Sequence, residues 1–373
     1  ASAGDVNGDG YADLIVGSVL YDAGEAEEGA AFVFLGSATG IADATPATAA
    51  AQLESNQINA QLGHSVAGAR DVNADGYSDV VVSAIAYDAG ESDEGAAFLF
   101  LGSATGIADG NPANADAQLE ADQANAGMGY SLAGAGDVNG DGYADLIASA
   151  TSYQAGESGE GAAWLFHGSA SGSAAAQLES NQINAALGQS VSGAGDVNGD
   201  GYADVIVGAV TYDAGEADEG AAFVFLGSAS GVADGNPATA FAQLESDQAG
   251  ALLGRSVAGV GDVNGDGYAD VASGALFYSA GEALEGAAFV YLGGSSGIAD
   301  ATELTAASRL ESDQFEARLG VSVAGAGDVN GDGYADLIAG AYHYDAGQAD
   351  EGAAFVFLGS ASGIADGNPA TAA

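Results

Sequence analysis

A nine-residue motif that recurs six times constrains the fold of this chain more than any other feature. It reads Asp-x-Asn-x-Asp-Gly-Tyr-x-Asp, and successive copies begin 66, 66, 59, 66 and 66 residues apart, at Asp5, Asp71, Asp137, Asp196, Asp262 and Asp328. Internal repeats of this length are typical of solenoids, propellers and arrays of small units. The fold of one repeat, copied six times, should therefore describe the whole chain.

The single short interval arises after Gly172, where Ser173, Ala174 and Ala175 replace a longer stretch. A repeat that loses seven residues without losing its phase loses them from a surface loop. We therefore expect a loop at this point.

Each repeat contains four short segments with strand-like composition, which in the second repeat are 62–69, 80–84, 96–101 and 117–120. Turns rich in Gly, Asp and Asn separate them, and no useful helical period occurs. Four strands per repeat predict an all-β protein, a β-propeller of four-stranded blades that is six-bladed or part of a seven-bladed ring. The whole chain, 1–373, then forms one domain. A parallel β-solenoid is the alternative, but its repeats are much shorter.

The position of each strand in a blade can also be anticipated. The first strand is rich in Gly and Ala, which suits the crowded position beside a central channel. The Phe-Val-Phe and Leu-Ile-Val strands are expected to fill the space between neighbouring blades.

The repeated motif has the chemistry of a calcium loop. Oxygen-bearing side chains occupy positions one, three, five and nine, and Gly at position six permits a sharp turn. Ca²⁺ prefers six to eight hard oxygen ligands, and in calcium loops position seven supplies a backbone carbonyl. The other interpretation is that Asp, Asn and Gly simply form hairpin turns. A turn does not need four oxygens at fixed offsets in six copies, and three adjacent carboxylates repel one another unless a cation neutralises them.

An oxygen cage built by the protein suits Ca²⁺ better than Mg²⁺. The sequence therefore predicts about one Ca²⁺ per repeat, in loops 5–13, 71–79, 137–145, 196–204, 262–270 and 328–336. The predicted ligands are Asp5, Asn7, Asp9, Tyr11, Asp13, Asp71, Asn73, Asp75, Tyr77, Asp79, Asp137, Asn139, Asp141, Tyr143, Asp145, Asp196, Asn198, Asp200, Tyr202, Asp204, Asp262, Asn264, Asp266, Tyr268, Asp270, Asp328, Asn330, Asp332, Tyr334 and Asp336.

With these loops, the chain resembles the FG-GAP repeat family, which builds the integrin α-subunit β-propeller and many bacterial surface proteins. Leu62-Gly63 and its counterparts stand where that family often has Phe-Gly, and Gly208-Ala209-Val210 stands where it has Gly-Ala-Pro. The missing Pro is a departure in every repeat. The resemblance implies calcium in each loop, partner binding on the propeller faces and an extracellular or cell-surface location. The integrin ligand-binding determinants have no matching residues here.

The charge of the chain excludes some partners. A net charge of −49, with four Arg and no Lys, is opposite to what nucleic acid or an anionic membrane surface requires. The acidity also suits a soluble protein of a saline environment. No apolar stretch is long enough to span a bilayer. No Cys is present, so disulfides and thiolate metal sites are excluded.

No catalytic residues are predicted, because an active site needs different groups converging on one point. His64, His167 and His343 fall at different repeat positions. We expect a non-enzymatic calcium-stabilised scaffold for adhesion or surface assembly, which binds a protein partner or self-assembles through a propeller face or an open seam. A glycan-binding lectin propeller is the alternative, and a polysaccharide-acting enzyme is a less favoured one.

The acidic connectors between the second and third strands allow two interpretations. Asp22, Glu25, Glu28 and their counterparts form either an acidic ring on one face or solvated hairpins that keep strand edges apart. We favour the hairpins, because charge runs usually face water.

Closing the ring poses a problem. From Asp328 through the termini to Asp5 there are 50 residues, 16 fewer than the usual interval. Comparison with 51–66 shows that two strands are missing, so exposed edges are expected at the seam. Either the chain is part of a longer protein, which we favour because Ala1 begins inside a repeat, or a neighbouring molecule supplies the strands.

Overall fold

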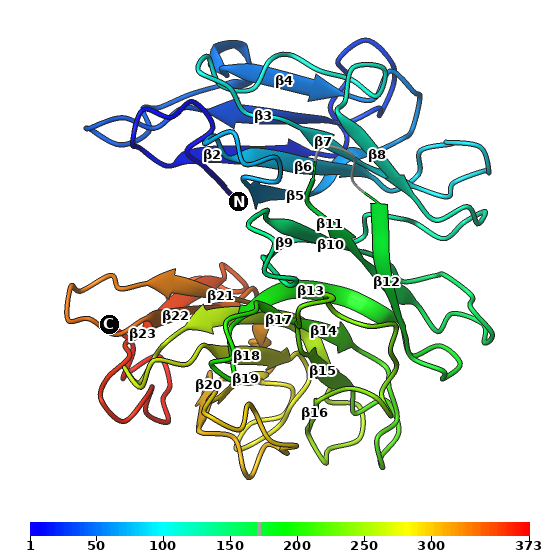
Figure 1. The fold of residues 1–373 in the computed structure, drawn as a ribbon. Coiled ribbons are helices and arrows are strands. Elements are labelled where there is room, and N and C mark those ends of the chain that lie inside the picture. Colours follow the sequence, from blue (N-terminus) through cyan, green and yellow to red (C-terminus); the bar gives the residue numbers. More distant parts are fainter. Residues whose placement is uncertain (170–172) are drawn as a thin grey trace.

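A computed structural model describes residues 1–169 and 173–373 (Figure 1). Within these ranges the chain forms 23 strands in six antiparallel sheets, and its one helical segment is the 3₁₀ turn η1 (Pro46–Thr48). Every sheet corresponds to one sequence repeat, which confirms the predicted all-β propeller of four-stranded blades. No helix in the described ranges is both long and apolar enough to cross a membrane.

The first three blades each contain four strands. Their strands are β1 (Ser2–Gly4), β2 (Asp13–Ser18), β3 (Ala30–Phe34) and β4 (Ala51–Glu54) in blade 1, β5 (Leu62–Arg70), β6 (Asp79–Ala84), β7 (Ala96–Phe100) and β8 (Ala117–Glu120) in blade 2, and β9 (Leu132–Gly136), β10 (Asp145–Ala150), β11 (Ala162–His167) and β12 (Ser173–Glu179) in blade 3.

The last three blades follow the same order, but the final one has three strands. Their strands are β13 (Leu187–Gly195), β14 (Asp204–Ala209), β15 (Ala221–Phe225) and β16 (Ala242–Glu245) in blade 4, β17 (Leu253–Gly261), β18 (Asp270–Ala275), β19 (Ala287–Tyr291) and β20 (Ser308–Glu311) in blade 5, and β21 (Leu319–Gly327), β22 (Asp336–Ala341) and β23 (Ala353–Phe357) in blade 6.

In blades 2 to 5 the second strand is buried on both faces. All six residues of β14 are buried, and Val207 pairs with Val191 on one side and Phe223 on the other. Because both faces of an inner blade pack against neighbouring blades, its strands read as continuous apolar runs without polar alternation. This packing explains the Leu-Ile-Val pattern of the repeat.

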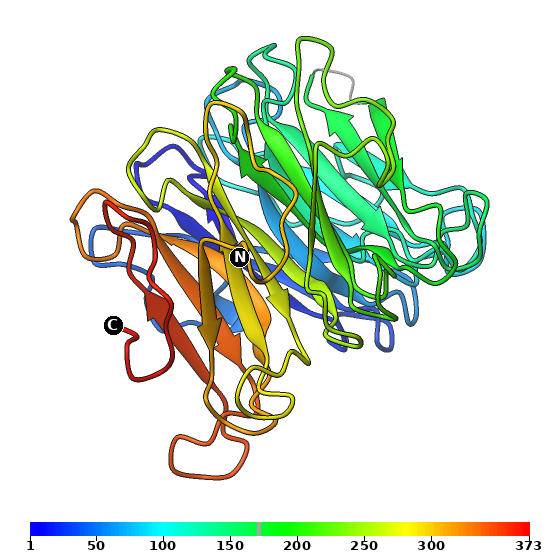
Figure 2. The ribbon, with the colours of Figure 1, turned by 90° about the horizontal axis from the view of Figure 1, so that it is seen from below.

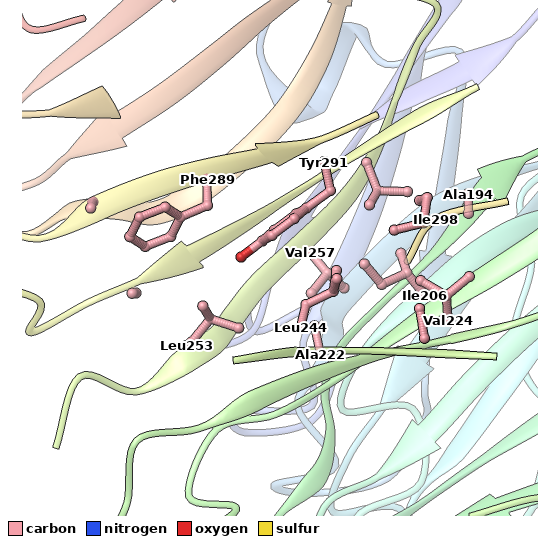
Figure 3. Close-up of a cluster of buried hydrophobic side chains, with 14 of the residues drawn as sticks. Ala194, Ile206, Ala222, Val224, Leu244, Leu253, Val257, Phe289, Tyr291 and Ile298 are labelled. Atoms are coloured by element: carbon pink, nitrogen blue, oxygen red, sulfur yellow. The ribbon is translucent and has the colours of Figure 1, made fainter. Parts of the chain in front are cut away.

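Five hydrophobic cores each join two consecutive blades. Figure 3 shows the core between blades 4 and 5, to which blade 4 contributes Ile206 and Leu244 and blade 5 contributes Phe289 and Tyr291. None of the cores in the described residues joins blade 6 to blade 1. The molecule is therefore held together blade by blade along the chain.

The first strands of consecutive blades lie side by side at the centre, as their Gly and Ala content predicts. The backbone approach is close there: a Cβ atom on Gly259 of β17 would lie 2.4 Å from the carbonyl oxygen of Gly193 in β13. Only glycine fits such a contact.

The ring is open at the predicted seam. Blade 6 lacks a fourth strand, and β1 has three residues where β5 has nine. Val16 in blade 1 is 41% exposed and Val329 in blade 6 is 55% exposed, whereas their counterparts Val82 and Val263 are fully buried. Figure 2 shows blade 6, in orange and red, at one end of the arrangement. Of the two strands that the sequence lacks, the fourth strand of blade 6 is absent from the fold, and the first strand of blade 1 is reduced to the three residues of β1.

The acidic connectors differ from both interpretations of the sequence. Asp22 and Glu25 are exposed, but Glu28 is buried. Its Oε1 accepts a hydrogen bond from the backbone N–H of Glu25 at 2.7 Å, and its Oε2 accepts one at 3.0 Å from the N–H of Asn56, which follows β4. The expectation of a solvated hairpin is therefore wrong for this Glu, which ties the connector to the chain entering the next blade.

Candidate metal centres

The six motif loops connect the first and second strands of their blades, so they all lie at the same edge of the ring. In blade 4 the loop begins after Gly195, the last residue of β13, and its position-nine residue Asp204 is the first residue of β14. The predicted shorter loop followed by a strand is thus what the structure contains.

Side-chain oxygens close each loop on its own backbone. In loop 71–79, the N–H of Asp75 donates to Oδ1 of Asp71 at 3.1 Å and to Oδ1 of Asn73 at 2.9 Å, and the N–H of Gly76 donates to Oδ2 of Asp71 at 2.8 Å. The N–H of Tyr77 donates to Oδ1 of Asp75 at 3.0 Å. Because one N–H contacts both Asp71 and Asn73, the oxygens of positions one and three converge on the same point.

The position-nine aspartate has a different environment. Asp79 is fully buried, and its two oxygens accept hydrogen bonds from the N–H groups of Val72 at 2.9 Å and Gly102 at 2.8 Å. Burial raises the pKa of Asp79 to about 6, and the nearby carboxylates of Asp75 and Asp71 add to the rise, which the two backbone hydrogen bonds oppose. Burial raises the pKa of the counterparts Asp204 and Asp270 to about 6 as well.

In blade 6 the position-one aspartate, Asp328, favours its charged form. Backbone N–H groups, first that of Gly333 and then those of Gly331 and Asp332, lower the pKa of the exposed Asp328. An anionic carboxylate at the loop entrance beside a buried carboxyl group is an arrangement that a cation would stabilise.

These residues fit a calcium ion in chemical type. Each loop offers three carboxylates, one amide oxygen and backbone carbonyls, which are the hard oxygen ligands that Ca²⁺ takes. Among the described residues no three His, Cys, Asp or Glu side chains cluster in a way that would hold a metal by themselves. The Asn at position three and the backbone carbonyl at position seven would therefore be needed to complete a site.

Consecutive loops also touch one another, which the sequence analysis did not anticipate. The ring of Tyr202 in blade 4 packs against Gly140 in the loop of blade 3, where an added Cβ would lie 2.7 Å from ring atom Cε1. The N–H of Ala203 donates to the backbone oxygen of Asp137 at 3.0 Å. Position seven was predicted only as a carbonyl ligand, although the presence of Tyr in all six copies was a signal that its ring matters.

The contact between a Tyr ring and the preceding loop is incomplete at the two ends of the row. Gly331 of blade 6 has open space where its counterparts meet a Tyr ring, and Tyr11 of blade 1, which has no preceding loop in this chain, is 42% exposed. The candidate metal centres therefore form a continuous row rather than six isolated sites.

Comparisons with known proteins agree with this repeat. Mouse integrin alpha-IIb is 36% identical over 151 residues, which cover 39% of this chain and 14% of that protein. Integrin alpha-5 of Xenopus laevis is 33% identical over 169 residues, which cover 44% of this chain and 15% of that protein. The chain thus matches only a small part of these curated relatives' own length.

A solved structure of rhamnogalacturonan lyase YesW aligns over 98% of this chain and 56% of that chain, with a TM-score of 0.43 and 12% identity. A likeness this low has no bearing on function. The FG-GAP repeat pattern matches residues 1–34, 62–100, 128–166, 187–225, 253–291 and 319–357. Because these matches include all six repeats and more than half of the residues, the chain belongs to the FG-GAP repeat family.

Proposed function

We propose that this chain is a non-enzymatic, calcium-stabilised propeller that acts outside the cell as a scaffold for adhesion or surface assembly through protein–protein contacts. The observation that carries the proposal is the row of six loops along one edge of the ring, which share the same pattern of oxygen-bearing residues. The integrin α relatives support a role in protein contacts. The three His lie in three different blades, and among the described residues no three His, Cys, Asp or Glu side chains gather in one cluster.

The chain's own residues explain why a cation would stabilise the fold. In each loop, positions one, three and five direct oxygens to the loop interior, and position nine is buried at the start of the second strand. When bound, Ca²⁺ would neutralise these carboxylates and join the two strands that the loop connects. Without calcium the folded state is less stable, because each loop then keeps a buried, charged carboxylate close to two other carboxylates.

Calcium counting combined with melting tests this proposal. After dialysis against millimolar calcium, elemental analysis should find close to six Ca²⁺ per chain, one per loop. Because an ion that binds only the folded state stabilises it by mass action, a chelator should lower the melting temperature, and added calcium should restore it. Far fewer than six ions, with melting unchanged by chelator, would contradict the proposal. Magnesium at the same concentration is the control and should restore less of the lost stability.

A second candidate, a glycan-binding propeller, is favoured by polar cavities at the outer rim. Gln52, Glu54 and Asp109 line a cavity of about 260 Å³ between blades 1 and 2, and Gln177, Glu179 and Asp234 line a cavity of the same size between blades 3 and 4. Convergent amide and carboxylate groups are suited to sugar hydroxyls. Glycan-array binding at saturating calcium that Glu179→Ala weakens would favour this function, and an empty array would exclude the tested glycans.

A further inference from the structure

One aromatic side chain occupies a position of the repeat that is otherwise small or polar. Phe241 directly precedes β16, and its counterparts in the other repeats are Ala50, Asp116, Ala175, Ala307 and Ala373. The Phe241 side chain is 42% exposed. A single exposed apolar side chain is common on protein surfaces, so its surroundings decide whether it has a role.

The backbone fixes Phe241 at the outer edge of blade 4. Its N–H donates to the oxygen of Val224 in β15 at 2.8 Å, which extends the pairing of β15 with β16 by one residue. Alternate side chains of a strand share a face, so Phe241, Gln243 and Glu245 lie on one side of this edge strand (Figure 1). The residues between them are fully buried. The ring therefore begins a row of three outward-facing side chains.

Blade 5 supplies the opposite wall. The N–H of Ala301 donates to the oxygen of Gln243 at 3.0 Å, and its oxygen accepts from the N–H of Glu245 at 3.0 Å. Oδ1 of Asp300 accepts a hydrogen bond from the N–H of Gln243 at 2.9 Å. With Phe241 and neighbouring threonines, these residues line a cavity of about 460 Å³ between the two blades.

Phe241 also borders a second cavity. This one has a volume of about 400 Å³ and is lined by residues of blade 4 that include Phe225 and Leu226. An edge of the Phe241 ring abuts Gly297 of blade 5, where an added Cβ would lie 2.4 Å from ring atom Cε1. Any side chain at position 297 would displace the ring. Both volumes are typical of sites for small ligands, which have about 300–1,000 Å³.

The polar groups of the larger cavity offer mainly hydrogen-bond acceptors. Nε2 of Gln243 donates to Oε2 of Glu245 at 2.7 Å. Oε1 of Glu245 and Oδ2 of Asp300 receive no hydrogen bond from the described residues. These two carboxylates repel an anion, and the net charge of −49 adds to that repulsion. The cavity therefore suits a ligand that has many O–H donors and no acidic group.

A pyranose sugar combines the two properties that this cavity requires. Its hydroxyl groups can donate to carboxylates, and its C–H groups carry a slight positive charge that packs against the negative face of an aromatic ring. A purely apolar ligand would instead cover Glu245 and Asp300 without giving them donors, which is unfavourable.

We infer that the cavity between blades 4 and 5 binds a pyranose sugar without acidic groups, which stacks on Phe241 while its hydroxyl groups donate to Glu245 and Asp300. This inference rests on the second candidate function, glycan binding. It names one junction of the propeller and one class of sugar.

The equivalent junctions lack the aromatic ring. Gln52, Glu54 and Asp109 repeat the polar pattern between blades 1 and 2, but their cavity has only about 260 Å³ and Ala50 takes the place of Phe241. The cavity between blades 3 and 4 has the same smaller volume and also no aromatic lining. The chain is therefore expected to hold one principal sugar site.

Saturation-transfer NMR of the calcium-loaded chain tests the ligand class. The probes are the methyl glycosides of glucose, galactose, mannose and N-acetylglucosamine, with glucuronic acid as the acidic control. At least one neutral glycoside should bind and glucuronic acid should not. Titration calorimetry with the neutral glycoside that binds should give one site per chain. Binding of glucuronic acid as strong as that of the neutral sugars would overturn the inference.

Substitutions at Phe241 test the stacking. Phe241→Ala should weaken sugar binding at least tenfold, and Phe241→Trp should retain it, because Trp also presents an aromatic face. Phe315→Ala, which removes another exposed Phe, is the matched control and should bind like the wild type. An affinity that Phe241→Ala leaves unchanged would overturn the inference.

A gain of function provides a second test. The N–H of Ala50 donates to the oxygen of Val33 at 2.8 Å, as that of Phe241 does to Val224, so Ala50→Phe places a ring in the equivalent position. This variant should bind two sugars per chain, and Ala50→Leu should still bind one. A single site in Ala50→Phe would contradict the assignment of the ring as the determinant of binding.

The outcomes separate this inference from the proposed functions. Glycan binding that Phe241→Ala does not weaken would overturn the inference and leave the glycan-binding candidate standing. No binding of any neutral glycoside would overturn the inference and count against that candidate. Neither result would affect the calcium-stabilised scaffold, because Phe241→Ala should leave the calcium count unchanged.

Discussion

The ring of Tyr268 in blade 5 lies directly against Gly199 in the loop of blade 4, where an added Cβ would be 2.6 Å from ring atom Cε1. The N–H of Ala269, beside this Tyr, donates to the backbone oxygen of Asp196 at 3.0 Å. One loop therefore forms part of the wall of the previous loop. Disturbance of one candidate calcium site is expected to reach its neighbours and to fade with distance around the ring.

Removing one loop carboxylate tests how far this coupling extends. Asp200→Ala in blade 4 should remove one Ca²⁺ per chain, because its Oδ1 and Oδ2 both act inside the loop. Hydrogen exchange should rise in loops 137–145 and 262–270 and stay unchanged in loop 5–13, since repeat units couple to their neighbours.

Asp332→Ala in blade 6 is the matched control for that variant. Its loop has a neighbour on one side only in this chain, because Gly331 contacts no following Tyr. Increased exchange should then appear in loop 262–270 alone. Simultaneous loss of all six ions from either variant would show global coupling and contradict this picture.

Two glycines of one loop should respond differently to alanine. Gly201 has φ +92° with open space around it, so alanine meets no clash but must adopt a left-handed backbone, which costs about 1–2 kcal/mol. Gly199 also has a left-handed backbone, with φ +75°, and an added Cβ would meet the Tyr268 ring. However, Ala74 already occupies the equivalent position in blade 2 with φ 57°, so this position tolerates Ala, whereas φ +92° at Gly201 lies further outside the left-handed region that Ala adopts. Thermal melting should therefore show a larger loss for Gly201→Ala, and the reverse order would contradict this reading of the loop.

The buried connector glutamate should stabilise the junction that follows it. Glu219 is 1% exposed, and its Oε1 accepts hydrogen bonds from the N–H groups of Ala214 at 2.8 Å and Glu216 at 2.9 Å. Glu219→Ala removes the two hydrogen bonds that the connector backbone donates to this buried carboxyl group, which should cost about 1–3 kcal/mol of unfolding free energy. Its counterpart Glu351 is exposed in blade 6, so Glu351→Ala should leave the melting temperature nearly unchanged. Equal losses in the two variants would show that burial is not the cause.

Leucines at equivalent positions of the fourth strands should also differ in how much they stabilise the fold, according to their burial. Leu244 is fully buried between blades 4 and 5, so Leu244→Ala should cost about 2–5 kcal/mol. Leu119 is only half-buried, beside a cavity of about 420 Å³ between blades 2 and 3, so Leu119→Ala removes fewer contacts and should cost clearly less in chemical denaturation. A cost for Leu119→Ala as large as that for Leu244→Ala would contradict burial as the cause of the difference.

The amino-acid sequence by itself determined the repeat, the strands and the loop chemistry. The spacing of Asp5, Asp71 and the later copies defines the blades, and short apolar runs between Gly and Asp turns define their strands. The 16-residue deficit between Asp328 and Asp5 also predicted the open seam. These features could be read because each depends on residues close together in the chain or on counting along it.

Only the tertiary structure decided how the repeats meet. The sequence does not show that Glu28 is buried, that Tyr202 covers Gly140, or that Ile41 is exposed while Ile107 is buried. Each depends on a neighbouring blade that contributes backbone or apolar surface from a different repeat. Identical segments can therefore differ in burial, because a repeat defines a blade locally, whereas the presence or absence of the next blade decides what that blade contacts.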